Sequence, residues 1–202
     1  NDHVNKGQST NDVIPTSGKI ALIRYFEQLI DEANKLIDSL NKKAEEFADV
    51  YKMGRTQLQD AIPMSLGQEF AAYSKVLSRD VNRFKKAIEA LSFVNLGGTA
   101  IGTGLNADER YVEEVVEVLA EVTGLDLKQN DDLIDGTQNL DSILFASSVL
   151  KTFAASLSKI SNDLRLMSSG PQTGIFDIKL PARQAGSSIM PGKVNPVIPE
   201  VV

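Results

Sequence analysis

Residues 184–196 read QAGSSIMPGKVNP and combine two adjacent serines with a lysine and an asparagine. Glycine and proline at this density exclude a regular helix or an inner strand, so the stretch is predicted to be a loop. A connecting loop needs turn residues and polarity. It has no need of Ile189 and Met190, or of a single cation set among hydroxyls and amides. The residues alone leave open whether this stretch is a simple turn or a binding or catalytic site.

Two other stretches carry the same kinds of side chain, QSTND at 8–12 and GRTQ at 54–57. Hydroxyls, amides and one lysine are the groups that bind a small polar anion by hydrogen bonds. Taken singly, each group could equally serve as a helix cap, because residues 9–11 precede a predicted helix. The candidate binding residues are Ser9, Thr10, Asn11, Thr56, Gln57, Ser187, Ser188, Lys193 and Asn195.

Other possible sites are weaker on their residues alone. GTGLNA at 102–107 matches the dinucleotide pattern G-x-G-x-x-A, but the chain has no alternation of strands and helices around it, so a tight glycine turn is favoured. Ser187 and Ser188 with Lys193 could suggest a Ser–Lys hydrolase, yet the G-x-S-x-G elbow is absent.

Metal sites are also disfavoured. His3 is the single histidine and there is no cysteine, which argues against zinc. The acidic stretch at 130–138 lacks the glycine and glutamate spacing of a calcium loop, and a solvated loop is expected there. We therefore expect neither a metal site nor a cofactor.

The composition narrows the class of protein. The net charge of −6 argues against general nucleic-acid binding, which needs a basic face. The lack of cysteine excludes disulfides and makes a cytoplasmic location the default. No apolar run approaches the roughly 18–20 residues that span a bilayer, and no signal peptide is recognised. The chain opens without methionine and stops where a helix is predicted after Pro199, so we interpret it as part of a longer protein.

Three segments have apolar residues spaced by threes and fours, which places one apolar stripe on one helix face. The stripes are Leu22, Phe26, Leu29, Ala33, Leu36 and Leu40; then Leu66, Phe70, Tyr73, Leu77, Val81, Phe84, Ile88 and Leu91; then Leu150, Phe153, Leu157, Ile160, Leu164 and Met167. A shorter helix is expected at 111–122, ended by Gly124. The stretches 8–16, 54–63, 96–106 and 130–138 are predicted to be loops.

Long helices with such stripes predict an elongated all-α bundle. The third helix also carries small residues off its stripe, namely Ala146, Ser147, Ser148, Ala154, Ala155, Ser156 and Ser158. A helix with little charge on several faces is usually surrounded by other helices, and other subunits are the expected source of these neighbours. The alternative is a helix that exposes weakly polar serine and alanine to solvent.

Together, QSTNDVIPT, GRTQLQDAIPMSLGQEF and GSSIMPGKVNP resemble, in order and spacing, the three signature regions of the aspartase/fumarase superfamily. NLGGTAIGTGLN and SKISNDLRLMSSGP extend the resemblance over nearly the whole chain. It implies an elongated bundle of long antiparallel helices that assembles into a homotetrameric core with active sites shared between subunits. Residues 1–202 would be the central helical-bundle domain, without the smaller domains at either end.

The resemblance also implies a reaction, the reversible elimination of an amine or water from a succinyl group to give fumarate through an aci-carboxylate. By position, Ser187 corresponds to the general base on a flexible loop. Lys193 and Asn195 match residues that hold the carboxylate near the leaving group. The remaining matches are Ser9, Thr10 and Ser188 at the aci-carboxylate, Asn11, Thr56 and Gln57 at the leaving amine, and Glu200 as the acidic partner of a histidine in fumarases.

Gln57 departs from the Thr-His pair of fumarases and several relatives. Glutamine cannot act as an acid or base, so it cannot help a poor leaving group such as hydroxide, whereas a protonated amine leaves as ammonia without a further proton. This favours deamination of L-aspartate. The alternatives are a fumarate hydratase, or an inactive helical oligomerisation fragment of such an enzyme.

Overall fold

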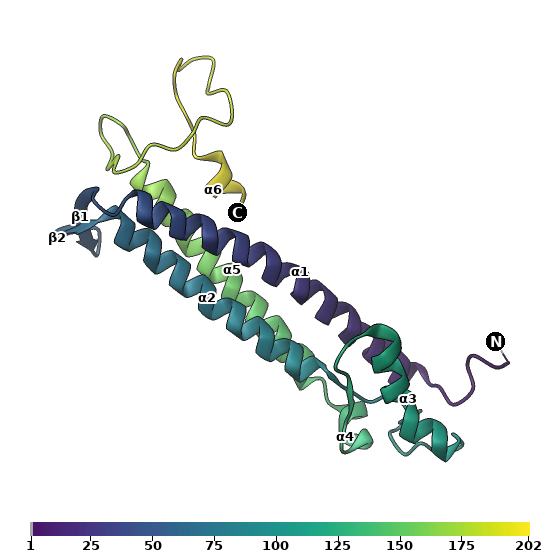
Figure 1. Ribbon diagram of the computed structural model, residues 1–202. Coiled ribbons are helices and arrows are strands. Elements are labelled where there is room, and N and C mark those ends of the chain that lie inside the picture. Colours follow the sequence, from purple (N-terminus) through teal and green to yellow (C-terminus); the bar gives the residue numbers. More distant parts are fainter. Residues whose placement is uncertain (1) are drawn as a thin grey trace. The chain divides into compact units, whose positions relative to one another are not determined.

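The computed structural model describes residues 2–202, and helices make up most of the chain (Figure 1). The helices are α1 (Thr10–Glu46), α2 (Leu66–Leu91), α3 (Glu109–Thr123), α4 (Leu133–Gln138), α5 (Asp141–Met167) and α6 (Val197–Val201). The strands are β1 (Tyr51–Thr56), β2 (Gln59–Ser65), β3 (Phe93–Val94) and β4 (Lys128–Gln129). The predicted helical class is confirmed.

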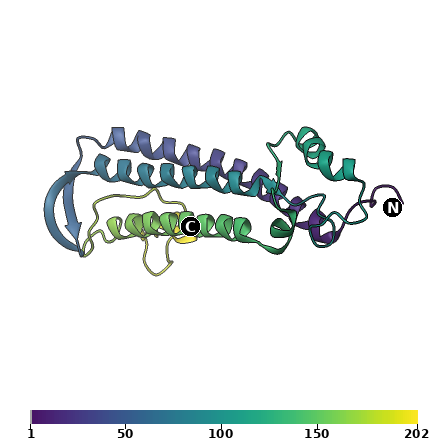
Figure 2. The same cartoon turned by 90° about the horizontal axis from the view of Figure 1, so that it is seen from below.

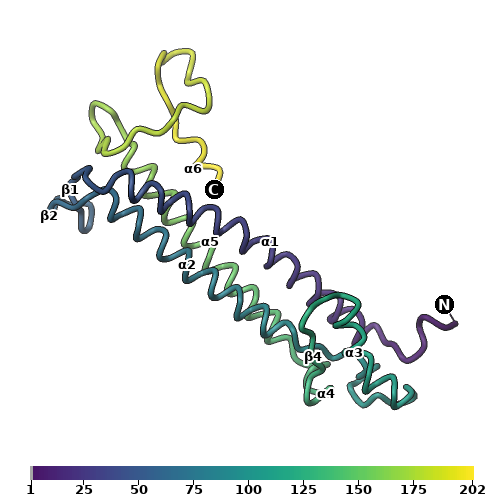
Figure 3. The backbone as a smooth tube through the Cα atoms, viewed as in Figure 1, coloured from purple at the N-terminus to yellow at the C-terminus, as the bar shows by residue number. Residues whose placement is uncertain are grey.

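Backbone contacts divide the chain into two compact units, and α1, α2 and α5 each contribute to both. The first unit contains the residues up to Asn34 together with Asp80–Leu150. The second contains Lys35–Arg79 and Lys151–Val202. The tube in Figure 3 shows how the chain passes along these three long helices and then forms loops between α5 and α6.

In the second unit, an antiparallel β1–β2 hairpin returns the chain from α1 to α2 (Figure 2). The Leu66 N–H donates to the Val50 carbonyl over 2.8 Å, which fixes the start of α2 against the end of the turn that follows α1. Aromatic rings fill the space between the helices, with Phe47 and Phe70 5.6 Å apart and Phe70 and Tyr73 5.8 Å apart. Burial of these rings stabilises this end of the helices.

The first unit has its own core. The rings of Phe26 on α1 and Phe84 on α2 lie 5.5 Å apart, and both side chains are buried. The short strands β3 and β4 pair in parallel beside α3. Helix α3 is capped by the Asp108 carboxylate and ends at Gly124 with a φ of 65°, so the predicted stop at this glycine is confirmed.

The stripe predicted for α2 is confirmed, because all eight of its residues are buried except Ile88, which is half-buried. In α5 the stripe is shifted, since Leu150 is exposed and the buried line begins at Ala146 and Val149. The small side chains of Ala154, Ala155 and Ser158 are exposed.

Helix α5 is also the most apolar of the long helices. By length and composition alone it is long enough and apolar enough to cross a bilayer, with a mean hydropathy of 1.3 over an 18-residue window. The sequence had not been expected to contain a segment of this kind. Only 22% of that window is buried within the chain. Helix α5 therefore presents much of its apolar surface uncovered.

The loop predicted at 8–16 is wrong, because α1 begins at Thr10. Ser9 and Asp12 form a reciprocal cap, in which the Asn11 N–H donates to the Ser9 hydroxyl and the Ser9 N–H donates to Asp12. Pro15 lies inside the helix and has no N–H for the Asn11 carbonyl. The Asn95 side-chain amide replaces that donor over 3.0 Å, so the helix continues through the proline.

The loop predicted at 54–63 is instead the β1–β2 hairpin. Gln57 and Leu58 form its two-residue turn with φ angles of 51° and 63°, and a pair of positive φ angles is typical of the type I′ turn. Positions 57 and 58 are Gln-Leu rather than the Asn-Gly or Asp-Gly typical of that turn, which explains why the pattern of residues did not indicate it.

Two further boundaries differ from the sequence analysis. The acidic stretch at 130–138 contains α4, because the Asp132 carboxylate caps the N–H groups of Ile134 and Asp135. Helix α6 begins at Val197 and contains Pro199 rather than following it. The glycine turn predicted at 102–107 is confirmed by positive φ angles at Gly102 and Gly104.

Candidate functional site

The first signature stretch forms the start of α1 in the first unit. Thr10 is exposed, and Ser9 is tied into the cap by its backbone and its hydroxyl. The Asn11 Nδ2 donates to the Ala100 carbonyl over 2.7 Å. Because only the amide nitrogen can donate there, this bond orients the side chain, and its Oδ1 stays available as an acceptor.

The second signature stretch forms the turn of the β1–β2 hairpin in the second unit. Thr56 and Gln57 are exposed, and Gln57 holds a positive φ without being glycine, a conformation that clusters at functional sites. Gln57 also lines a cavity of about 340 Å³. Lys52, Arg55 and Asp163 contribute charged groups to the same cavity.

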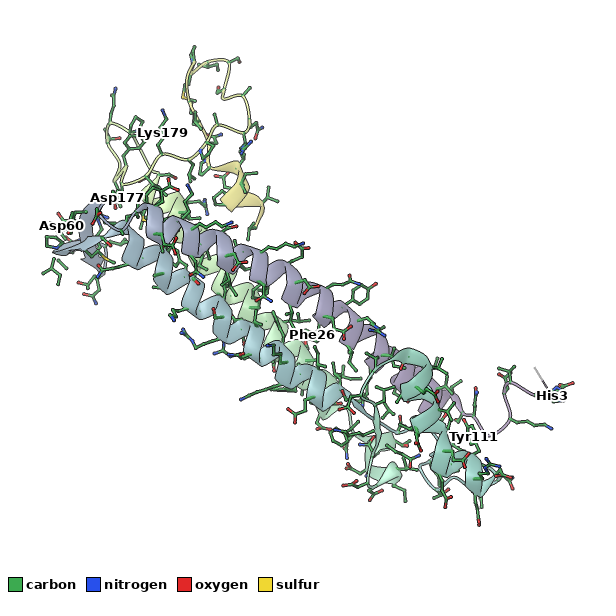
Figure 4. The ribbon with its side chains drawn as sticks, in the orientation of Figure 1. His3, Phe26, Asp60, Tyr111, Asp177 and Lys179 are labelled. Carbon is green, nitrogen blue, oxygen red and sulfur yellow. The ribbon has the colours of Figure 1, made fainter. Side chains whose placement is uncertain are left out.

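Beside this cavity lies a network of ion pairs that holds the hairpin. Lys52 Nζ is 2.6 Å from Glu69 Oε2 and 3.4 Å from Asp177 Oδ2. Arg55 donates two hydrogen bonds to Asp177, of 2.5 and 3.3 Å. Figure 4 shows Asp177 beside the hairpin that carries Asp60. Asp177 precedes the loop at 184–196 in sequence, so one carboxylate links the hairpin to the segment that leads to that loop.

The electrostatics of Asp177 follow from these partners. Burial by itself raises the pKa of its carboxyl, but the hydrogen bonds and charges of Arg55 and Lys52 outweigh burial and hold the pKa below its usual range. Asp177 is therefore a carboxylate at neutral pH, as a two-bond contact with a guanidinium requires.

A tyrosine that contacts two carboxylates of this cavity is held neutral. The Tyr73 hydroxyl lies 3.0 Å from a carboxylate oxygen of Glu69 and 3.0 Å from one of Asp163. Burial and these two carboxylates raise its pKa far above the ordinary value. Asp163 also pairs with Lys159. Every charged group described at this cavity has a partner of opposite sign.

The third signature stretch forms the loop between Gly186 and α6. A Cβ on Gly186 would lie 2.1 Å from the Lys193 carbonyl oxygen, so only glycine permits the two ends of this loop to meet. Ser187 is half-buried, and its hydroxyl oxygen accepts the Ile189 N–H over 3.3 Å. Ser188 is exposed. The loop therefore brings the backbone of Lys193 next to the residue before Ser187.

A second cavity, of about 610 Å³, opens beside this loop. Lys193 and Asn195 line it together with Glu200, whose carboxylate lies 4.0 Å from Arg165. Lys179 and Arg165 are the other charged lining residues, which makes three cations against one carboxylate. A cavity with this excess of positive charge suits an anionic ligand.

The structure brings some of the predicted residues together and not others. Lys193, Asn195 and Glu200 share the larger cavity, whereas Gln57 lines the smaller one. Ser9, Thr10 and Asn11 belong to the first unit, and the other predicted residues belong to the second. The predicted site is thus three separate groups of residues along the chain.

The sequence did not indicate several residues that hold the elements of the candidate site in place. Lys52, Arg55 and Asp177 meet only through the hairpin, and no local pattern indicated the contact. Asp12 was detectable, because Ser9-x-x-Asp12 has the spacing of a capping box.

His3 lies on the stretch ahead of α1, and Tyr111 lies on α3 (Figure 4). Among residues 2–202, no group of three or more His, Cys, Asp or Glu side chains is arranged to hold a metal ion.

Comparisons with known proteins identify the family to which this chain belongs. The sequence model of a lyase family, described as "Lyase", matches residues 1–202. The aspartate ammonia-lyase of Bacillus subtilis strain 168 is 53% identical over 202 residues, which is 100% of this chain and 42% of that protein. The chain thus spans less than half the length of this curated relative.

Two solved structures agree with the fold. A fumarate lyase:delta crystallin from Brucella melitensis bound to cobalt has a TM-score of 0.96 and 48% identity, covering 99% of this chain and 44% of that one. A recombinant class II fumarase from Schistosoma mansoni has a TM-score of 0.94 and 38% identity, covering 99% and 45%. The chain therefore belongs to this lyase family, the aspartase/fumarase superfamily.

Proposed function

We propose that this chain is the central helical domain of a longer ammonia-lyase, which converts L-aspartate reversibly to fumarate and ammonia. The observation that carries the proposal is the 53% identity to an aspartate ammonia-lyase over the whole of this chain. The glutamine at position 57 supports it, because an amide can contact an ammonium group but cannot protonate a departing hydroxide.

In the proposed reaction, Ser187 Oγ removes a proton from C3 of aspartate, and the electron pair moves into the adjacent carboxylate to form the aci-carboxylate. The bond between C2 and nitrogen then breaks, the double bond of fumarate forms, and the ammonium leaves as ammonia. The Ile189 N–H already points at Ser187 Oγ over 3.3 Å. A hydrogen bond to the charged form favours that form, so this N–H would stabilise the serine alkoxide.

The groups proposed to bind the two carboxylates differ in charge. Lys193 and Asn195 line a cavity in which cations outnumber carboxylates, which suits the carboxylate next to the leaving group. Ser9, Thr10 and Ser188 supply hydroxyls for the aci-carboxylate. Donors placed where negative charge develops usually contribute the largest share of catalysis.

The proposed amine-side groups are Asn11, Thr56 and Gln57. An ammonium group can only donate hydrogen bonds, so its binding site must offer acceptors. The Asn11 amide fits this need, because its Nδ2 is engaged by the Ala100 carbonyl and its Oδ1 is the part left for a ligand. Glu200 pairs with Arg165 and is proposed to support the larger cavity rather than to touch substrate.

We further propose a homotetramer in which different subunits contribute the three groups of residues to each active site. The exposed small side chains of α5 support it, since a helix of this hydropathy with only 22% of its most apolar window buried needs further neighbours. On this account the isolated chain of 202 residues is inactive unless it assembles. A cytoplasmic location remains a prediction.

A fumarate hydratase is the second candidate, because the class II fumarase of Schistosoma mansoni matches with a TM-score of 0.94. An absorbance assay for fumarate separates the two when the full-length protein is given aspartate and then malate. Fumarate from aspartate alone supports the ammonia-lyase. Fumarate from malate alone would replace that proposal with the hydratase, and the 202-residue chain assayed in parallel tests the inactive-fragment alternative.

A further inference from the structure

Asp12 on the first turn of α1 is fully buried and binds three backbone N–H groups. Its Oδ1 accepts the Ser9 N–H over 2.9 Å. Its Oδ2 accepts the N–H groups of Gly97 and Thr99, over 3.3 and 3.0 Å. The side chain has 0% relative exposure, so this one carboxylate joins the first signature stretch to the loop after β3 from within the core of the first unit.

The loop after β3 contacts the start of α1 at further points. Asn95 donates to the Asn11 carbonyl, and the Ala100 carbonyl accepts from the Asn11 side chain. Asn11 is thus held at its backbone and at its amide by the same loop whose backbone N–H groups bind Asp12. A shift of this loop would move the acceptor that we assign to the substrate amine.

The loop is strained where Asp12 holds it. Thr99 has a φ of 56°, which is unfavourable for a β-branched residue. Such conformations persist only where the surroundings impose them. Here the Thr99 N–H is fixed by the Asp12 carboxylate and the next carbonyl, that of Ala100, is fixed by Asn11. The carboxylate therefore maintains the conformation that presents Ala100 to Asn11.

We propose that Asp12 is a positioning residue, which holds Ser9 and Asn11 in the geometry that binds an amino dicarboxylate. The inference rests on the proposed function for the identity of the substrate, but the contacts are independent of the reaction. Asp12 does not touch substrate; it acts through the Ser9 cap and through the loop that orients Asn11.

The test is Asp12→Asn in the full-length protein. An amide presents a donor where the carboxylate presents an acceptor, so either the Ser9 N–H or the N–H groups of Gly97 and Thr99 lose their partner and face another donor. Because a misplacement of about 1 Å can cost ~10²-fold in rate, we expect kcat/KM for aspartate to fall ~10- to 100-fold, mainly through a higher KM. Titration with succinate, a dicarboxylate that has no leaving group, should show affinity weakened ~10-fold.

Asp80→Asn is the matched control. Asp80 is also 0% exposed and lies in the first unit, but its carboxylate pairs with Arg83, within α2. We expect the melting temperature of Asp80→Asn to fall about as far as that of Asp12→Asn. The KM of Asp80→Asn and its affinity for succinate should stay within about twofold of wild type. Equal losses of affinity in the two variants would mean that Asp12 only supports the fold, and the inference would be overturned.

Asp12→Glu keeps the charge and provides a second test of the inference if Asp12→Asn does not fold. The extra methylene displaces the carboxylate from its three donors, so we expect a folded protein with an intermediate rise in KM. Wild-type KM and wild-type succinate affinity in Asp12→Glu would overturn the inference. If the wild-type protein acts on malate and not on aspartate, the proposed reaction fails, while the succinate titrations of both variants still decide the role of Asp12.

Discussion

Ser187 lies half-buried at one end of a loop closed by the contact of Gly186 with the Lys193 carbonyl. Its hydroxyl oxygen accepts a backbone N–H, and Lys193 follows on the same loop. A serine is a weak base unless its alkoxide is stabilised, and an N–H together with a nearby cation are the groups that do so. At the scale of single residues, the proposed chemistry depends on this loop and on the amides of Asn11 and Gln57.

Ser187→Ala in the full-length protein should lower kcat by the ~10²–10⁴-fold typical of a lost general base. The affinity for aspartate should change little, because Lys193 and Asn195 remain. Exchange of the C3 proton of aspartate with deuterated solvent, followed by NMR, measures proton removal directly. Exchange at the wild-type rate in the alanine variant would show that another residue takes the proton.

Gln57→Ala should raise KM for aspartate ~10-fold or more, because a hydrogen bond to a charged group contributes about 1.5–3 kcal/mol. Gln57→His should retain part of the deamination activity, since a neutral imidazole can still accept from an ammonium. Steady-state kinetics of both variants check this. An unchanged KM in Gln57→Ala would remove Gln57 from the amine side of the site.

At the scale of elements, the β1–β2 hairpin presents Gln57 and depends on buried ion pairs for its position. Arg55 and Lys52 on β1 both reach Asp177, which lies on the segment after α5. Their side chains are 19% and 9% exposed and that of Asp177 is 12% exposed, so solvent screens these pairs little. Removal of one partner leaves a charge buried with fewer contacts, which is costly.

Asp177→Asn should therefore destabilise the protein by about 1–3 kcal/mol at neutral pH, measured by denaturant unfolding. Lys52 keeps Glu69 and Arg55 keeps Asp60 at 3.7 Å, which limits the loss. Asp60→Asn is the control, because Asp60 is 76% exposed and an exposed pair contributes little. Equal effects of the two substitutions would contradict a role for the buried network.

The same pair predicts a dependence on pH. The pKa of Asp177 is lower in the folded protein than the value of about 3.9 for an unperturbed aspartate. Its contribution to stability is therefore fully present above about pH 4 and is lost as pH falls through the folded-state pKa. Unfolding measured from pH 7 to pH 2 should show a smaller acid-dependent loss in Asp177→Asn than in wild type. Parallel curves for the two proteins would argue against this assignment.

At the scale of the whole molecule, α5 is a long apolar helix that the chain leaves largely uncovered. Its small residues Ala154, Ala155 and Ser158 are exposed, while Phe153 and Ile160 on the opposite side are buried. Small side chains allow another helix to approach closely, and a buried apolar face between subunits would stabilise an assembly. The two cavities of the second unit and the α1 start in the first unit would then be completed by other copies.

Ala155→Glu should weaken this assembly, because it places a charge in the proposed interface between subunits. Sedimentation at micromolar concentration should show a tetramer for the full-length wild type and smaller species for the variant. Ala61→Glu makes the same change at an exposed site on β2 and should leave the tetramer intact. A wild-type monomer, or a tetramer unaffected by Ala155→Glu, would contradict the proposed interface.

The sequence by itself determined the features that depend on local periodicity and on the types of neighbouring residues. The α2 stripe, the stop of α3 at Gly124 and the glycine turn near Gly102 all follow from preferences that act within a few residues. The signature stretches likewise identify the family without reference to the fold. The start of α1 was missed because Pro15 is normally a boundary signal, and only a donor from Asn95, distant in sequence, lets the helix pass through it.

Only the tertiary structure decided which distant residues meet. The hairpin turn at Gln57 has none of the usual turn residues, and the strands that flank it pair on both sides of an irregularity between Met53 and Arg55. Asp177 reaches Arg55 across 122 positions of sequence, and Asp12 reaches Gly97 across 85. The hydrogen-bond donors of a buried carboxylate come from segments that folding brings next to it. Its partners therefore follow from the packing of the chain, which no local pattern of residues contains.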